Sequence, residues 1–112
     1  MPHCVLEYNA DLAKQVSVDD LLENVFEGMV AAELFGRKDI KVRAQAYAHH
    51  LSGASYQNFM NVNIYLLPGR TGEQKQALTE LVLAGLESLQ IPSAELSVQA
   101  IELEANYVKA FT

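Results

Sequence analysis

The sequence opens Met1-Pro-His-Cys-Val-Leu-Glu-Tyr8, and this stretch decides the first element of the fold. Residues 2–8 form a mostly apolar run, which is typical of a strand covered on both faces. Pro2 follows Met1 directly, and a small second residue usually permits removal of the initiator methionine. We therefore expect a mature chain that begins with the secondary amine of a proline at the start of a buried strand.

A helix is predicted after a polar connector over residues 9–16. Ser17 is a suitable N-cap, and Asp20 occupies the capping-box position where Glu or Gln is usual. The following residues place apolar side chains on one helical face: Leu21, Leu22, Val25, Phe26, Met29 and Val30. This spacing predicts a helix over about residues 18–34, and Gly36 is its expected terminator.

The pattern changes to period two over residues 39–48, which predicts a second strand. Small apolar side chains alternate there with polar ones: Ile40, Val42, Ala44 and Ala46 with Lys41, Arg43, Gln45 and Tyr47. Residues 49–57 are predicted to form a loop, with Gly53 among its turn signals. A third, mostly apolar strand is expected over residues 58–67.

The order of strand, helix and strand then repeats. The Pro-Gly-Arg sequence at 68–70 ends the third strand, and Thr71 with Gln74 forms a second capping box. Apolar spacing predicts a helix behind it that ends before Pro92, because proline cannot continue a helix. A fourth strand is predicted over residues 96–103.

Two β-α-β units in a chain of 112 residues predict a fold of the α/β (α+β) class. We expect a single domain over residues 1–112, with pseudo-repeats at about 1–57 and 58–112. The duplicated units should form one four-stranded mixed sheet with both helices on one face, through right-handed crossovers. The other face has no cover within the chain, so we expect an exposed apolar sheet face that oligomerisation would bury.

Composition excludes several classes of partner. The formal net charge of −6 argues against nucleic-acid binding, because phosphate contacts need clustered Lys and Arg and these are scattered. Cys4 is the only cysteine, which excludes an intrachain disulfide and a Cys-based metal site. His49 and His50 are adjacent, a poor geometry for chelation, so no metal is expected. Without a secretory leader or a membrane-spanning apolar run, we expect a cytoplasmic protein with no membrane partner.

Pro2 is the first candidate for chemistry. A chain-terminal amine titrates at roughly pH 7.7–8.0, and burial or nearby cations lower its pKa. Such an amine is partly free near neutral pH and can remove a proton beside a carbonyl group. The alternative is structural, because a proline is common at a strand start. Of its neighbours, His3 is expected to be a satisfied strand histidine and Cys4 a buried, inert thiol.

Three cationic side chains are candidates for binding an anion. Arg70 lies at the start of the second predicted helix, where backbone amides also attract anions, and its alternative is a solvated loop arginine. Arg43 and Lys41 share the polar face of the second strand. The alternative for Arg43 is an interfacial ion pair with Glu7, Glu102 or Glu104. Because guanidinium pairs with carboxylate through two parallel hydrogen bonds, the arginines suit a dicarboxylic or oxo-acid substrate.

Four stretches together resemble a known family: Met1 to Tyr8, Ile40-Lys-Val-Arg-Ala44, Gly69-Arg-Thr71 and Asn106-Tyr-Val-Lys-Ala-Phe111. The set is similar to 5-carboxymethyl-2-hydroxymuconate isomerase, a branch of the tautomerase superfamily. The resemblance implies a homotrimer with inward-facing sheets and a cofactor-independent isomerase of aromatic catabolism. It also implies that Pro2 moves a proton in a 2-hydroxymuconate-type dienol as acid/base, while Arg70, Arg43 and Lys41 bind the small carboxylate substrate.

The sequence departs from that family pattern in the second strand. The family motif carries two arginines, and here Lys41 replaces the first while Arg43 keeps the second. Lysine provides a point charge rather than a fork, which together with a shorter tail points to a changed substrate rather than a changed reaction. Two alternatives stay open. One is another superfamily activity, such as phenylpyruvate enol–keto conversion or dehalogenation, and the other is a non-catalytic small-molecule-binding or structural oligomer of ferredoxin-like order.

Overall fold

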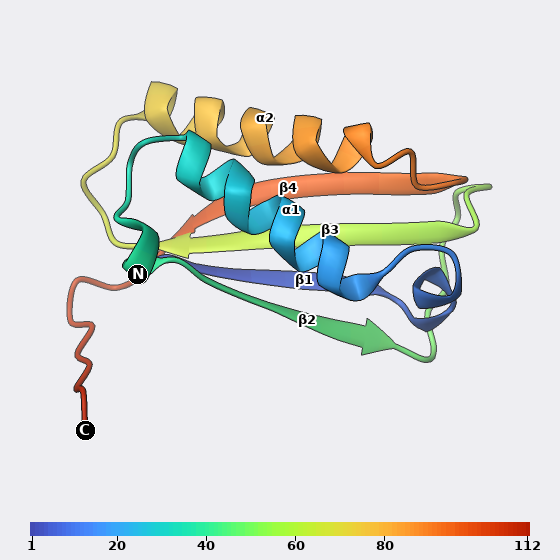
Figure 1. Ribbon diagram of the computed structural model, residues 1–112, viewed down its shortest axis with the longest axis horizontal. Helices are drawn as coiled ribbons and strands as arrows, with labels where there is room; N and C mark the ends of the chain where they lie inside the picture. The colour runs from blue at the N-terminus through green and yellow to red at the C-terminus, as the bar shows by residue number, and fades with distance from the viewer.

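Two strand–helix–strand units form the sheet, and the computed structural model describes them over residues 1–112 (Figure 1). The strands are β1 (His3–Asn9), β2 (Lys41–Tyr47), β3 (Asn58–Leu66) and β4 (Ala94–Glu102). Their order in the sheet is β2-β1-β3-β4, so the first strand of each unit lies at the centre. β1 is parallel to β2, β3 is parallel to β4, and β1 is antiparallel to β3. The predicted four-stranded mixed sheet is confirmed.

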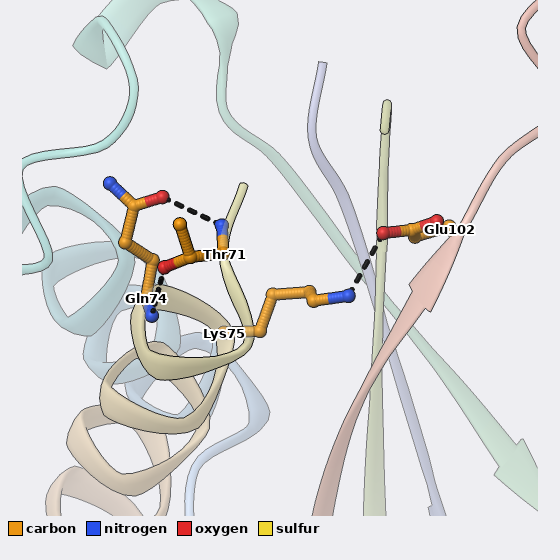
Figure 2. Close-up of polar contacts among 4 residues, drawn as sticks. All are labelled: Thr71, Gln74, Lys75 and Glu102. Carbon is orange, nitrogen blue, oxygen red and sulfur yellow. Dashed lines mark hydrogen bonds and ion pairs between the residues drawn. The ribbon is translucent and has the colours of Figure 1, made fainter. Parts of the chain in front are cut away.

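The helices α1 (Val18–Ala31) and α2 (Gly72–Ser88) both pack on one face of this sheet, as predicted (Figure 1). Ser17 Oγ caps α1 by accepting a hydrogen bond from the backbone N of Asp20 at 3.3 Å. In the capping box of α2, Thr71 Oγ1 accepts from Gln74 N at 3.1 Å and Gln74 Oε1 accepts from Thr71 N at 2.9 Å (Figure 2). Neither helix combines the length and the apolar character that crossing a membrane requires.

The core fills the space between the helices and the sheet. Its buried side chains are Cys4, Leu6, Tyr8, Leu12, Leu21, Val25, Met29, Ile40, Met60, Val62, Ile64, Leu66, Leu78, Val82 and Leu86. They alternate along the two central strands and recur at helical spacing on the helices, so the binary pattern of the sequence determines the layering. At the rim, Lys75 Nζ lies 2.9 Å from Glu102 Oε1 and connects the first turn of α2 to the end of β4 (Figure 2).

The predicted polar connector over residues 9–16 is wrong in part. It contains a short 3₁₀ helix, η1 (Ala10–Lys14), at the right of Figure 1. Leu12 is fully buried in the core, and this single apolar anchor gives the segment a fixed conformation. One apolar residue among polar ones carries no periodicity, so the sequence pattern did not indicate it.

The predicted end of the first helix is also wrong. α1 stops at Ala31, and Glu33 has a positive φ of 58°, so the helix does not continue to Leu34. Gly36 has a φ of −69° and precedes a second short helix, η2 (Arg37–Asp39), instead of terminating α1. In the turn that follows the helix, the backbone N of Glu33 donates to the carbonyl oxygen of Val30 at 3.1 Å.

The face of the sheet opposite the helices is open within the chain, and it is not the apolar surface predicted from the sequence. Its side chains are mixed on every strand: His3, Val5 and Glu7; Lys41, Arg43, Gln45 and Tyr47; Phe59, Asn61, Asn63 and Tyr65; Glu95, Ser97, Gln99 and Ile101. Within the chain β1 is therefore covered on one face only, with Cys4, Leu6 and Tyr8 buried beneath the helices.

Hydrogen bonds connect the polar side chains of this open face across β3 and β4. Asn61 Oδ1 accepts from Ser97 Oγ at 2.7 Å, and Asn63 Oδ1 accepts from Gln99 Nε2 at 2.9 Å. Asn61 Nδ2 also donates to Asn63 Oδ1 at 3.1 Å, which joins the two pairs. The β3–β4 part of this face is therefore an ordered polar surface.

Candidate active site

One end of the sheet gathers most of the predicted site residues, and we call it the Pro2 end. β1 and β2 begin there, whereas β3 and β4 end there, because the two units run in opposite directions (Figure 1). Cα pairing places His3 between Lys41 of β2 and Tyr65 of β3, with Ile101 of β4 beyond. Segments distant in sequence, including the amino terminus and the residues after β4, therefore meet at this end.

Pro2 is buried immediately before β1. Its carbonyl oxygen accepts a hydrogen bond from the backbone N of Lys41 at 3.1 Å, which joins the two strand starts. The Met1 amine and Lys41 Nζ both donate to the carbonyl oxygen of Asp39, at 3.0 and 3.2 Å. Burial lowers the pKa of the Met1 amine, and the charges of Lys41 and Lys109 lower it further. The chain end thus lies in surroundings that favour an uncharged amine.

Arg43 lies on the open face of β2 and forms no ion pair with a glutamate, so the alternative of an ion pair is not found within the chain. Its partner is His3, whose Nδ1 lies 3.2 Å from Arg43 Nη1. His3 Nε2 lies 2.9 Å from Tyr107 Oη, although these two residues are 104 positions apart in the chain. His3 is therefore more than a strand histidine satisfied by its own backbone neighbours, because it connects β2 to the carboxy-terminal tail.

A cavity of about 220 Å³ opens beside these three side chains. Its lining residues are His3, Arg43, Tyr65, Leu103 and Tyr107. Burial lowers the pKa of His3, and the charge of Arg43 lowers it further, so the imidazole is neutral at pH 7 and Arg43 is the charged group of the lining. The phenol rings of Tyr65 and Tyr107 and the guanidinium of Arg43 are suited to a flat, conjugated carboxylic acid.

Arg70 lies apart from this cavity. Its Nη2 donates to the carbonyl oxygen of Leu34 at 2.9 Å, and its Cζ lies 4.9 Å from the centroid of the Phe35 ring. The segment between α1 and β2 that receives Arg70 is the same one that supplies Asp39 to the chain end. The structure thus brings Pro2, Lys41 and Arg43 together, and it places Arg70 against the same connecting segment without a hydrogen bond to them.

The remaining polar candidates have structural partners. Glu7 accepts a hydrogen bond from the Tyr47 hydroxyl, which raises the pKa of Tyr47. Cys4 is fully buried, and burial raises the pKa of its thiol to about 12, in line with the inert thiol that was predicted. The ring of His50 packs on Phe59, with centroids 4.9 Å apart. No three His, Cys, Asp or Glu side chains lie close enough together to share a metal ion.

Sequence reasoning missed the part of the site that the tail provides. Tyr107 and Leu103 follow β4, and Tyr65 is the penultimate residue of β3, yet all three line the cavity. Tyrosines are more often core or interface residues, which is how these were interpreted. The only available signal was the similarity of the tail stretch, Asn106 to Phe111, to the family.

Solved structures with the same fold define the class of protein. A 5-carboxymethyl-2-hydroxymuconate delta-isomerase is 17% identical over 100% of this chain and 89% of its own, with a TM-score of 0.85. A 5-carboxymethyl-2-hydroxymuconate isomerase from Deinococcus radiodurans R1 is 22% identical, over 99% and 90%, with a TM-score of 0.81. A malonate semialdehyde decarboxylase, solved also as a mutant with its first residue changed from proline to alanine, is 18% identical over 96% and 90%, with a TM-score of 0.69. The chain therefore shares the fold of these enzymes.

The sequence places the chain more narrowly. The model of the 5-carboxymethyl-2-hydroxymuconate isomerase family matches residues 2–110, nearly the whole chain. The protein belongs to this family, and it is an isomerase. A sequence comparison with curated proteins finds no significant match. Of the two kinds of function left open by the sequence, the enzyme is confirmed and the non-catalytic oligomer is not supported.

Proposed function

We propose that this isomerase converts an unsaturated 2-hydroxy (dienol) carboxylic acid, such as 5-carboxymethyl-2-hydroxymuconate, to its 2-oxo isomer without a cofactor. Pro2 is the acid/base of the reaction. Its amine takes the proton of the 2-hydroxyl group as the carbonyl forms, and it returns a proton to a distant carbon of the dienolate. Substrate and product have the same atoms, so the step needs neither an oxidant nor a second substrate.

The observation that carries the proposal is the position of the chain end. Once Met1 is removed, the Pro2 nitrogen becomes a secondary amine at a buried strand start. It then lies one residue from the position of the Met1 amine, whose pKa is lowered by burial and by the charges of Lys41 and Lys109. A base with a pKa near the working pH transfers protons efficiently. The relative with the mutated first proline offers a parallel on the same fold.

Cations supply the electrostatic part of the proposed mechanism. Arg43 and Lys41 bind a carboxylate from the open face and stabilise the negative charge that develops on the dienolate. Arg70 binds a second carboxylate, for which it keeps free donors, because the contact with Leu34 uses one of the five N–H groups of a guanidinium. Its plane is held against the Phe35 ring, so little side-chain freedom is lost on binding.

We also infer that the protein is a homotrimer, as the family resemblance implies. The open sheet face offers ordered Asn, Ser and Gln side chains that a second copy can meet with its own polar groups. Size-exclusion chromatography with light scattering should give three times the chain mass of 12.4 kDa. A stable monomer at working concentration would count against the trimer and leave the assignment of Pro2 unaffected.

The direct test compares the same chain with and without Met1. Retained methionine makes the Pro2 nitrogen an amide, which has no basicity, so we expect turnover only in the Met1-free form. Intact mass distinguishes the two forms, and ketonisation of 2-hydroxymuconate is followed by ultraviolet absorbance. All side chains from Pro2 onward are identical in the two preparations, so each controls for folding of the other. Equal turnover by both forms would contradict the role of Pro2.

A further inference from the structure

The contacts of His3 define its tautomer. A guanidinium has only donors, so Arg43 Nη1 must donate to His3 Nδ1 across their 3.2 Å contact. The proton of the neutral imidazole then resides on Nε2, which donates to Tyr107 Oη at 2.9 Å. His3 therefore accepts on one side and donates on the other, and only its neutral form can do both.

His3 also anchors the tail. Beyond β4 the chain has no regular structure and leaves the body of the molecule (Figure 1). Val108 and Phe111 are 92% and 87% exposed, whereas Tyr107 is half-buried with its ring edge toward His3. Leu103 and Tyr107 supply the tail's part of the cavity wall. The backbone N of Leu103 donates to the carbonyl oxygen of Leu66 at 2.8 Å, and the bond to His3 holds Tyr107 four residues further on.

We propose that neutral His3 is a positioning residue that holds the Arg43 guanidinium and the Tyr107 phenol on the wall of the substrate cavity. This inference rests on the proposed function, since it assigns the cavity to the carboxylate substrate. By fixing one guanidinium edge, His3 orients the remaining donors of Arg43 for carboxylate binding. By fixing Tyr107, it makes the tail a part of the substrate site instead of a loose terminus.

The arrangement is sensitive to acid. The groups around His3 are Arg43 and Lys41 of β2, Tyr65 of β3, the chain-terminal amine, and Tyr107 and Lys109 of the tail. A protonated imidazole places an N–H on Nδ1, opposite the N–H of Arg43, so the bond to Arg43 breaks. Burial and these cations lower the pKa of His3, and the release of Arg43 therefore occurs below the ordinary value of about 6.5.

Two substitutions separate the two bonds. His3→Asn keeps an acceptor near the position of Nδ1 and loses the donor to Tyr107, whereas His3→Gln keeps a donor near Nε2 and loses the acceptor for Arg43. In Met1-free protein we expect His3→Gln to raise the KM for 2-hydroxymuconate about tenfold, with a smaller change in kcat. We expect His3→Asn to raise KM about threefold and to remove the increase in KM that wild type shows in acid. His49→Gln, in the exposed loop, is the matched control and should match wild type.

Nuclear magnetic resonance gives a readout that does not depend on turnover. In ¹⁵N-labelled wild type, the His3 ring should be in the Nε2–H form at pH 7, and Tyr107→Phe should increase the mobility of the tail amides. Wild type that turns over 2-hydroxymuconate, with a His3→Gln variant of unchanged KM, would overturn the role of His3 while leaving the proposed function intact. A wild type without turnover would contradict the proposed function. In that case an Nδ1–H tautomer or an unaffected tail would overturn the positioning role as well, and the predicted tautomer with a mobile tail would support it.

Discussion

The two ends of the sheet use polar groups in opposite ways. At the end away from Pro2, which we call the Asn58 end, Asn9 and Asn58 are 4% and 3% exposed and bond to each other at 2.9 Å. Asn58 Nδ2 also donates to Gln15 Oε1 and to the Pro92 carbonyl oxygen, at 3.0 and 2.8 Å. Asn9 Oδ1 accepts from the backbone N of Phe59 at 2.9 Å. Every polar group of the Asn58 side chain therefore has a partner within the chain.

The Pro2 end instead gathers like charges. The chain-terminal amine lies near Lys41 and Lys109. The charges of these lysines lower its pKa more than the charge of Asp39 raises it. A satisfied buried network stabilises one conformation, whereas clustered cations oppose folding and attract anions. The Asn58 end therefore provides rigidity, and the clustered cations of the Pro2 end support the binding role that we propose for it, because departures from local satisfaction usually mark a functional site.

The largest effect is expected for Pro2→Ala in Met1-free protein. Alanine keeps a chain-terminal amine, but a primary one without the proline ring, so kcat/KM should fall about 100-fold or more. Steady-state ketonisation of 2-hydroxymuconate measures this change. The thermal midpoint should move by only a few degrees, because the Pro2 carbonyl bond to Lys41 is retained. An undiminished kcat/KM would contradict the functional role that we propose for the Pro2 end.

A change at the Asn58 end should affect stability without affecting chemistry. Asn58→Ala removes the hydrogen-bond partner of Asn9 Nδ2, Gln15 Oε1 and the Pro92 carbonyl oxygen, so the free energy of unfolding should fall by about 3 kcal/mol. Urea denaturation measures it, and kcat of the folded fraction should be unchanged. Gln57→Ala, at an exposed neighbour, is the control and should have little effect. A reduced kcat with normal stability would reverse the roles of the two ends.

Arg70→Ala should have an intermediate effect, on binding. Losing a guanidinium that pairs with a second carboxylate should raise the KM for a dicarboxylate about tenfold, and the KM for a monocarboxylate much less. Parallel kinetics with 2-hydroxymuconate and with phenylpyruvate enol separate the two cases. An equal rise for both substrates would mean that Arg70 acts only through its contacts with Leu34 and Phe35.

The smallest effect is a gain from Lys41→Arg. A fork of donors in place of a point charge should lower the KM for a dicarboxylate by about threefold, since bidentate pairing becomes available beside Arg43. Lys38→Arg, on the exposed η2 segment, controls for the change in side-chain size. A higher KM in Lys41→Arg would indicate that the site requires the lysine, and that its substrate differs from the dicarboxylate proposed.

Local signals in the sequence predicted the elements well. The caps at Ser17 and Thr71 and the period-two pattern of residues 39–48 each depend on neighbours within a few residues, and all are confirmed. The predicted end of α1 was wrong because the chain turns at Glu33, which has a positive φ of 58°. A positive φ is uncommon for a residue other than glycine, so neither residue type nor periodicity indicated this turn.

The candidate site could likewise be predicted only where the signal was local in the sequence. Pro2, Lys41 and Arg43 were predicted from residue type and place in the strand, and the sheet register brings them together. The roles of these residues remain predictions. Tyr107 was missed because its partner His3 lies at the other end of the chain. Asn61 and Asn63 alternate with the buried Met60, Val62 and Ile64 along β3, so strand phase, and not total apolar content, determines the polarity of the open face.

The antiparallel pairing of β1 and β3 has a consequence for the number of terminal amines in each molecule. The pairing relates the two β-α-β units by an approximate two-fold axis, so the start of β3 at the Asn58 end is the counterpart of the start of β1. At β1 the strand begins next to a chain terminus. At β3 the chain continues without a break from Gln57. The equivalent nitrogen there is the backbone amide of Asn58, which donates to Ser93 O at 2.8 Å. Two separate half-chains would offer two terminal amines, whereas the fused chain offers one terminal amine for two equivalent positions.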